Sequence, residues 1–175
     1  MARQSQAGVV MAALDPAIHL TYSRDRLTCR ASTRIRKRAA MAQEGLVSIA
    51  SRYSAAETME RLLAALQKRD LTVFARIDHA AGAAAVGIPL RPTEVVLFGN
   101  PKGGTVLMQD QQRAGIDLPL KALVWQGGDG KVWLSYNAPD WIAARAGLGE
   151  KSAGAVAAMT KALAAIADEV TKEVA

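Results

Sequence analysis

The chain contains only one cysteine, Cys29, and two histidines, His19 and His79, among its 175 residues. A single cysteine excludes an intrachain disulfide, and this usage is typical of a protein of the reducing cytoplasm. One Cys and two His are too few for a zinc site of these ligands within one chain, so we expect neither a metal site nor a cofactor. The sequence also lacks an apolar run of about eighteen residues, the length that spans a membrane, and it has no G-x-S-x-G nucleophile motif.

The excess positive charge is confined to one end of the sequence. The net charge is +6, and residues 1–40 supply all of it with eight Arg or Lys and two Asp, whereas residues 41–175 hold fourteen charges of each sign. Residues 1–40 show no sustained apolar period, so we expect a disordered basic extension followed by a single domain over residues 41–175. The basic cluster at residues 34–38 suits nucleic acid or an anionic membrane surface. Two alternatives explain the same composition. The segment is a solvated extension without a partner, or the start codon has been assigned too far upstream and translation begins at Met41.

Half of the residues are apolar, and their spacing predicts the order of elements. Period-two alternation predicts strands over residues 46–53 and 71–79, and a third strand, apolar on both sides, is predicted over residues 93–100. Two further strands flank the hairpin turn Gly-Gly-Asp-Gly at residues 127–130. A capping box, Ser54 to Glu57, starts a helix that ends near Arg69, and a long helix follows Ser152. The predicted order is strand, helix, four strands with short helical insertions, and helix.

The hairpin predicts an apolar sheet face that needs a cover. If its loop is residues 128–130, Trp125 faces Trp133 on one side of the sheet, and Val124 faces Leu134 on the other. Helices in this order normally cover one face. The face with Trp125, Trp133 and Leu123 would then be larger than the apolar patches that monomers expose, so we expect a homodimer through these residues. The alternative is that a short helix at residues 139–146 covers this face within the chain.

Residues 99–105, Gly-Asn-Pro-Lys-Gly-Gly-Thr, have the glycine spacing of a phosphate-binding loop, but Thr105 stands where that motif has its Lys. We expect Thr105 to cap a short helix, whose free amides and a nearby Lys would hold a carboxylate or phosphate. Other polar residues join this site if the last four strands are antiparallel neighbours in chain order. The candidate ligand-binding residues are Asn100, Lys102, Gly104, Thr105, Asp117, Lys121 and Tyr136. In the alternative, the segment is a simple turn in which Asn100 bonds its own backbone and Asp117 caps a turn.

Three segments, RIDHAAGAAAVGIPLRPTEVVLFGNPKGGTVLM, IDLPLKALVW and DGKVWLSYNAP, resemble the bacterial and archaeal family called domain of unknown function 302. The resemblance covers about residues 44–174. It implies an α+β, TATA-binding-protein-like β-α-β4-α fold, with an antiparallel sheet and helices packed on one face, and a homodimer; it assigns no reaction. In this family a His often follows the Arg of the segment YNAPDWIAARAGL, where this chain has Ala146 after Arg145.

His79 and Arg91 are expected at the other ends of the strands, away from the site with Asn100 and Lys102. His79 continues the inward face of its strand, so we expect it to point inward or at a rim, either as a hydrogen-bonded core residue or as an acid or base near neutral pH. We expect first a non-catalytic, dimeric domain that binds a small, anionic ligand. An enzyme that uses His79 with Arg91 is the alternative. A nucleic-acid-binding module is a third option, against which the zero net charge of residues 41–175 argues.

Overall fold

The computed structural model describes residues 44–172, so the expected basic extension and its boundary at residue 40 lie outside the described residues. The strands are β1 (Leu46–Ser51), β2 (Thr72–Asp78), β3 (Thr93–Gly99), β4 (Leu120–Gln126) and β5 (Val132–Asn137). The helices are α1 (Ala55–Gln67), α2 (His79–Ala85), α3 (Pro101–Asp110), α4 (Pro139–Ala146) and α5 (Glu150–Thr171), with a short 3-10 helix, η1, at Gln112–Asp117. This order confirms the predicted sequence of elements.

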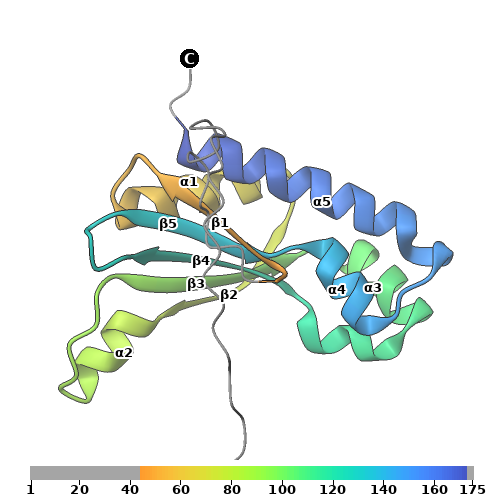
Figure 1. The fold of residues 1–175 in the computed structure, drawn as a ribbon, viewed down its shortest axis with the longest axis horizontal. Helices are drawn as coiled ribbons and strands as arrows, with labels where there is room; N and C mark the ends of the chain where they lie inside the picture. Colours follow the sequence, from red (N-terminus) through yellow and green to blue (C-terminus); the bar gives the residue numbers. More distant parts are fainter. Residues whose placement is uncertain (1–43, 173–175) are drawn as a thin grey trace, which may run out of the picture. The chain divides into compact units, whose positions relative to one another are not determined.

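The five strands form one antiparallel sheet in the order β1-β5-β4-β3-β2. The last four strands adjoin in chain order, as expected, and β1 pairs with β5 at the far edge. The long helix α5 and helix α1 lie together on one face of this sheet (Figure 1). The structure therefore confirms the α+β class with helices packed on one face.

The hydrophobic core lies between the sheet and these two helices. Every second side chain of the central strands points toward the helices, and Val96, Phe98, Val124 and Leu134 are buried there. The helices contribute Met59, Leu62 and Leu66 from α1 and Leu163, Ile166 and Val170 from α5. Removal of this apolar surface from water, at about 25 cal/mol per Å², is the main stabilising term of such a layer.

Ser54 caps the start of α1, as predicted, and its hydroxyl accepts a hydrogen bond from the Glu57 amide at 3.2 Å.

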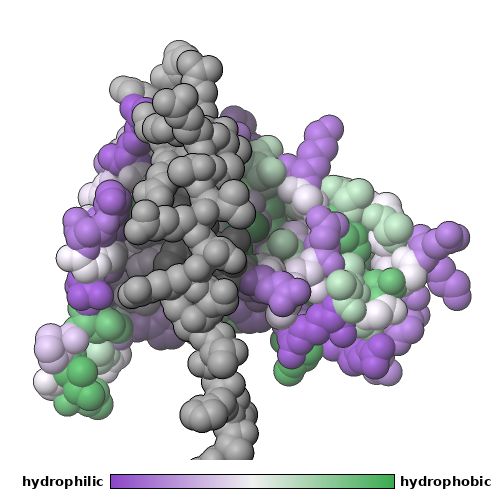
Figure 2. Space-filling view, viewed as in Figure 1, coloured by the Kyte–Doolittle hydropathy of each residue, from purple (hydrophilic) through white to green (hydrophobic). Residues whose placement is uncertain are grey.

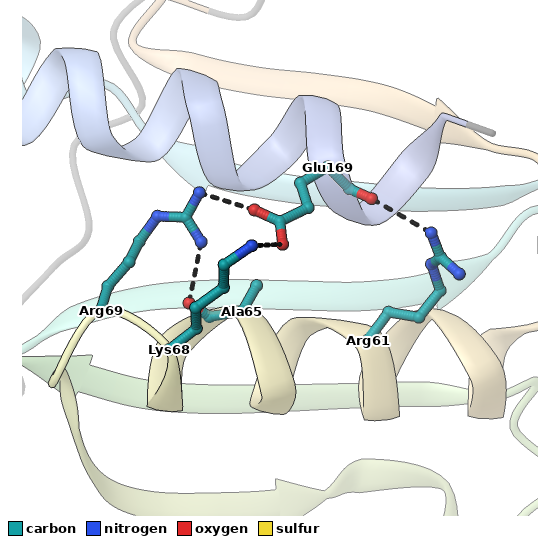
Figure 3. A network of polar contacts seen from close by, with 5 residues as sticks. All are labelled: Arg61, Ala65, Lys68, Arg69 and Glu169. Atoms are coloured by element: carbon teal, nitrogen blue, oxygen red, sulfur yellow. Dashed lines mark hydrogen bonds and ion pairs between the residues drawn. The ribbon is translucent and has the colours of Figure 1, made fainter. Parts of the chain in front are cut away.

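Glu169 of α5 faces two cations that follow the end of α1. Arg69 donates a hydrogen bond to its carboxylate at 2.6 Å and Lys68 donates one at 3.4 Å (Figure 3). These hydrogen bonds, above all the one from Arg69, lower the pKa of Glu169. Because the groups are partly solvated, they orient the two helices more than they stabilise the fold.

The β4–β5 hairpin has the predicted register. The Gly127 amide donates to the Lys131 carbonyl at 2.8 Å, so the loop is residues 128–130. Trp125 lies opposite Trp133, and their rings stack with centroids 6.1 Å apart on the sheet face away from the core. The Trp125 indole also donates to the Ser135 hydroxyl at 2.9 Å. Helix α4 packs mainly against α5 and η1. It therefore does not cover the tryptophan face of the sheet, which was the alternative to a dimer.

Strand β2 departs from the predicted pattern. A bulge between Val73 and Ala75 inserts Phe74 into this edge strand, so the expected unbroken alternation through residues 71–79 is wrong. The strand ends at Asp78, whose carboxylate accepts a hydrogen bond from the Ala81 amide at 2.9 Å and starts α2. His79 is consequently the first residue of a helix with an exposed side chain. Of the two expected positions, inward or at a rim, the inward one is wrong, because the Asp78 cap outweighs the alternation.

Candidate ligand-binding cleft

A cleft of about 740 Å³ lies between α3, α5 and the end of the sheet where β3 stops. The sheet contributes Phe74, Phe98 and Leu120, and the segment after η1 contributes Leu118 and Pro119. Helix α5 contributes Ala155, Ala158, Met159, Ala162, Leu163 and Ile166. Among the lining residues within the range 44–172, only three have polar side chains, and all three lie at the start of α3: Asn100, Lys102 and Thr105.

Helix α3 begins earlier than the glycine pattern predicted. Asn100 is its N-cap, and the side-chain oxygen accepts a hydrogen bond from the Lys102 amide at 2.9 Å. Pro101 occupies the first turn, where a missing amide costs nothing. The prediction that Thr105 caps this helix is wrong, because Asn100 followed by proline is the stronger start signal. The alternative, in which Asn100 bonds nearby backbone, is confirmed in this respect.

One glycine, Gly103, lets α3 approach α5 closely. A Cβ atom at Gly103 would lie 3.1 Å from the Met159 terminal methyl, and one at Gly104 would lie 3.7 Å from a Leu118 methyl. Glycine in a helix costs conformational entropy compared with alanine. At Gly103 the missing side chain lets the first turn of α3 lie against Met159 of α5, whereas a side chain at Gly104 would meet Leu118 at an ordinary contact distance.

The charge at the cleft comes from one side chain. Lys102 is the only charged residue among the described residues that line the cleft, and its side chain is exposed. Its ammonium forms no ion pair with any residue in the range 44–172. It lies in the first turn of α3, where the helix dipole is positive. The mouth of the cleft therefore favours an anion.

Four of the seven predicted ligand-binding residues, Asn100, Lys102, Gly104 and Thr105, line this cleft, and three do not. Asp117 accepts two hydrogen bonds from Arg145, at 2.6 and 2.7 Å. Lys121 pairs with Leu97 on the face that carries the tryptophans. Tyr136 lies on the core face, where burial, and secondarily the charge of Asp168, raise its pKa. Ligand binding by the four cleft residues stays a prediction.

His79 and Arg91 lie at the other end of the sheet, and neither of them lines the cleft between α3 and α5. The Arg91 guanidinium donates to the Gln126 carbonyl at 3.1 Å, and the Thr93 hydroxyl donates to the Arg91 carbonyl at 2.9 Å. A second hollow of about 740 Å³ at this end is lined by polar residues that include Asp78, Glu94 and Gln126, but by neither His79 nor Arg91. A catalytic role for this pair stays a prediction.

The described range offers neither a metal-binding cluster nor a membrane-spanning helix. Within residues 44–172, no three His, Cys, Asp or Glu side chains gather closely enough to hold a metal ion. None of the helices in that part of the chain combines the length and the apolar character of a membrane span.

The antiparallel sheet, its single helical layer and the cleft at one end define a small α+β domain. The chain belongs to the family described as domain of unknown function DUF302, whose model matches residues 47–166. A crystal structure of an uncharacterized conserved DUF302 protein from Bacillus stearothermophilus has a similar fold, with a TM-score of 0.66 over 73% of this chain and 99% of that chain. At 19% sequence identity, this likeness concerns the fold alone.

Relatives with higher identity carry a functional name. Two proteins named Fluoride-specific ion channel FluC 1, from Brucella suis biovar 1 and Brucella abortus biovar 1, are 50% identical to this chain over 121 residues. The match covers 69% of this chain, but 48% and 45% of those two proteins. This chain therefore spans about half the length of the curated relatives that it matches.

Proposed function

We propose that this chain is a non-catalytic, dimeric domain that binds a small ligand in the cleft between α3 and α5. The observation that carries the proposal is the composition of the cleft. Its volume of about 740 Å³ suits a small molecule, its walls are apolar, and its few polar groups lie together at one side. Binding sites for small molecules typically combine these properties.

The dimer is supported by apolar surface outside the cleft. Trp125, Trp133 and Leu123 stand half-buried on the sheet face opposite α1 and α5. Helix α2 has no buried residue, and the segment after it exposes Val86 and Ile88 to 70% and 60%. Apolar residues gather at the lower left of Figure 2, where Figure 1 shows α2. A second copy related by a two-fold axis would cover such surface on both chains.

Native mass spectrometry of protein purified from its own host tests both parts of the proposal. We expect the mass of two chains and an additional mass from a retained small molecule. Mild denaturation should release that molecule intact, because no covalent step is involved. A bare, single-chain mass under the gentlest conditions, together with no thermal shift in a metabolite library, would contradict the proposal.

The relatives favour a second function. The 50% identity to about half of each FluC 1 protein supports a role for this domain alongside a fluoride channel. In that role, the domain would raise the capacity of the cell to remove fluoride. Deletion of residues 44–172 from the host gene should then lower the fluoride concentration that stops growth, with chloride at equal concentration as the control. Unchanged fluoride tolerance would exclude this role.

A further inference from the structure

We infer that the ligand of the cleft is an aliphatic carboxylic acid, whose chain lies along α5 and whose carboxylate meets Lys102. This inference rests on the proposed ligand-binding function and adds the chemical class of the ligand. It depends on three properties of the cleft: the lack of polar groups in its walls, its shape along α5, and its single charge.

The walls exclude ligands that are polar throughout. The lining side chains away from α3, such as Phe98, Leu163 and Ile166, are apolar, and these three belong to the hydrophobic core. A sugar, a nucleotide or a small dicarboxylate in this space would lose its hydrogen bonds to water without replacing them. The buried part of the ligand must therefore be hydrocarbon.

The shape of the α5 wall suits an extended chain. Ala155, Ala158 and Ala162 follow one another at steps of three and four, so they share one side of the helix. Seven residues of helix rise about 10 Å, which makes this row of small side chains a shallow track of that length. Met108 and Met159 lie along the same cleft, and their flexible thioethers can adapt to hydrocarbon of variable outline.

The mouth of the cleft selects the head group. Lys102 is its only charged lining residue and has no ion-pair partner within residues 44–172. No Asp or Glu of the part of the chain that the structure describes lines the cleft, so no carboxylate from that part competes for this ammonium. An anionic head group there gains a charge-assisted hydrogen bond, which a neutral alcohol of the same length cannot match.

Titration calorimetry with decanoate, decanol and succinate, each below any aggregation limit, tests the inference. We expect decanoate to bind, decanol to bind more weakly, and succinate not to bind. Lys102→Gln should weaken decanoate about tenfold, as expected for the loss of one charge-assisted contact, and should leave decanol unchanged. Lys161→Gln, which changes an exposed Lys of α5 outside the cleft, should have no effect.

A second pair of variants tests the track on α5. Ala158→Leu fills the cleft and should abolish decanoate binding, whereas Ala157→Leu changes an exposed neighbour outside it and should not. The inference is overturned if decanoate does not bind, or if it binds equally well to Ala158→Leu. If another compound binds to the wild type and Ala158→Leu abolishes that binding, only the ligand class is wrong. If nothing binds, the proposed function fails as well.

Discussion

Asp110 at the end of α3 is hydrogen-bonded to Ser152 in the first turn of α5. Its carboxylate accepts from the Ser152 hydroxyl at 2.6 Å and from the Gly149 amide at 2.7 Å. Helix α5 begins at Glu150, two residues before the serine that was expected to open it, and Gly149 at its N-cap has no side chain to cap it. The carboxylate of another helix therefore does so. Because α3 and α5 form two walls of the cleft, this contact also fixes their separation at one end.

The Asp110 contact should make stability depend on pH. The Ser152 hydroxyl, and then the Gly149 amide, lower the pKa of Asp110 below its value in the unfolded chain. Its contribution is therefore complete above the unfolded pKa and is lost as the pH falls through the folded pKa. We expect Asp110→Ala to have a lower Tm than the wild type at neutral pH, with a difference that closes in acid. A difference that does not shrink as the pH falls below the unfolded value of about 3.9 would contradict this assignment.

The stacked tryptophans predict the behaviour of an interface variant. Trp125→Glu places a charge on the face that we propose to be covered by a second copy, so it should release monomers or cause aggregation. Sedimentation velocity at micromolar concentration measures the outcome. Lys131→Glu, in the exposed turn of the same hairpin, is the matched control and should remain dimeric. A wild type that already sediments as a monomer would refute the dimer.

The residue after Arg145 offers a test of the family pattern. Ala146 is 4% exposed and packs with Leu107, Ala114 and Val156, so an imidazole has no room there. Ala146→His should lower the free energy of unfolding by about 1–3 kcal/mol, the usual cost of overpacking. Ala144→His, on the exposed side of α4, should change it little. Thermal and urea denaturation of both variants measure this difference. An equal effect of the two substitutions would mean that the site can accommodate the family's histidine.

The basic N-terminal segment predicts a separable property. Residues 1–40 carry the entire net charge and no apolar period, so their deletion should leave the Tm unchanged. Any binding to heparin or DNA should disappear with them, because residues 41–175 are neutral overall. Calorimetry and a salt gradient on heparin resin measure the two properties. A Tm lowered by several degrees would show that the segment packs on the domain.

Much of the sheet could be predicted because its signals are local. The Trp125–Trp133 pair follows from counting outward from a glycine-rich loop, since alternation fixes which residues face each other. The start of α1 follows from the Ser54–Glu57 spacing. In both cases the residues that decide the geometry are near each other in the sequence.

The cleft could be predicted only in part. The prediction that Asn100 and Lys102 lie at a strand end is correct. The sequence does not show, however, on which face of the sheet a side chain lies once the alternation along a strand is broken. The bulge that turns Phe74 into the cleft has no glycine to mark it. Ala155, Ala158 and Ala162 were missed for another reason: periodicity detects large apolar residues, and these create the site by being small.

Lys121 shows the same limit on the sheet itself. It is at the strand end where it was expected, but it pairs with Leu97, whose neighbours Val96 and Phe98 face the core. Side chains of adjacent residues in a strand point to opposite faces, so Lys121 lies on the tryptophan face and away from the cleft. Proximity along a sheet edge is therefore not enough to assemble a site.

The bulge in β2 also affects how readily these molecules can aggregate through the edge of their sheet. β2 is an edge strand, and the unpaired amides and carbonyls of an edge are a template on which another chain can add a strand. The extra residue at Phe74 breaks the even spacing of that row. Growth of a continuous sheet from copy to copy is disfavoured at this edge. We therefore expect the irregularity that brings an aromatic ring to the cleft to disfavour fibril formation through this edge as well.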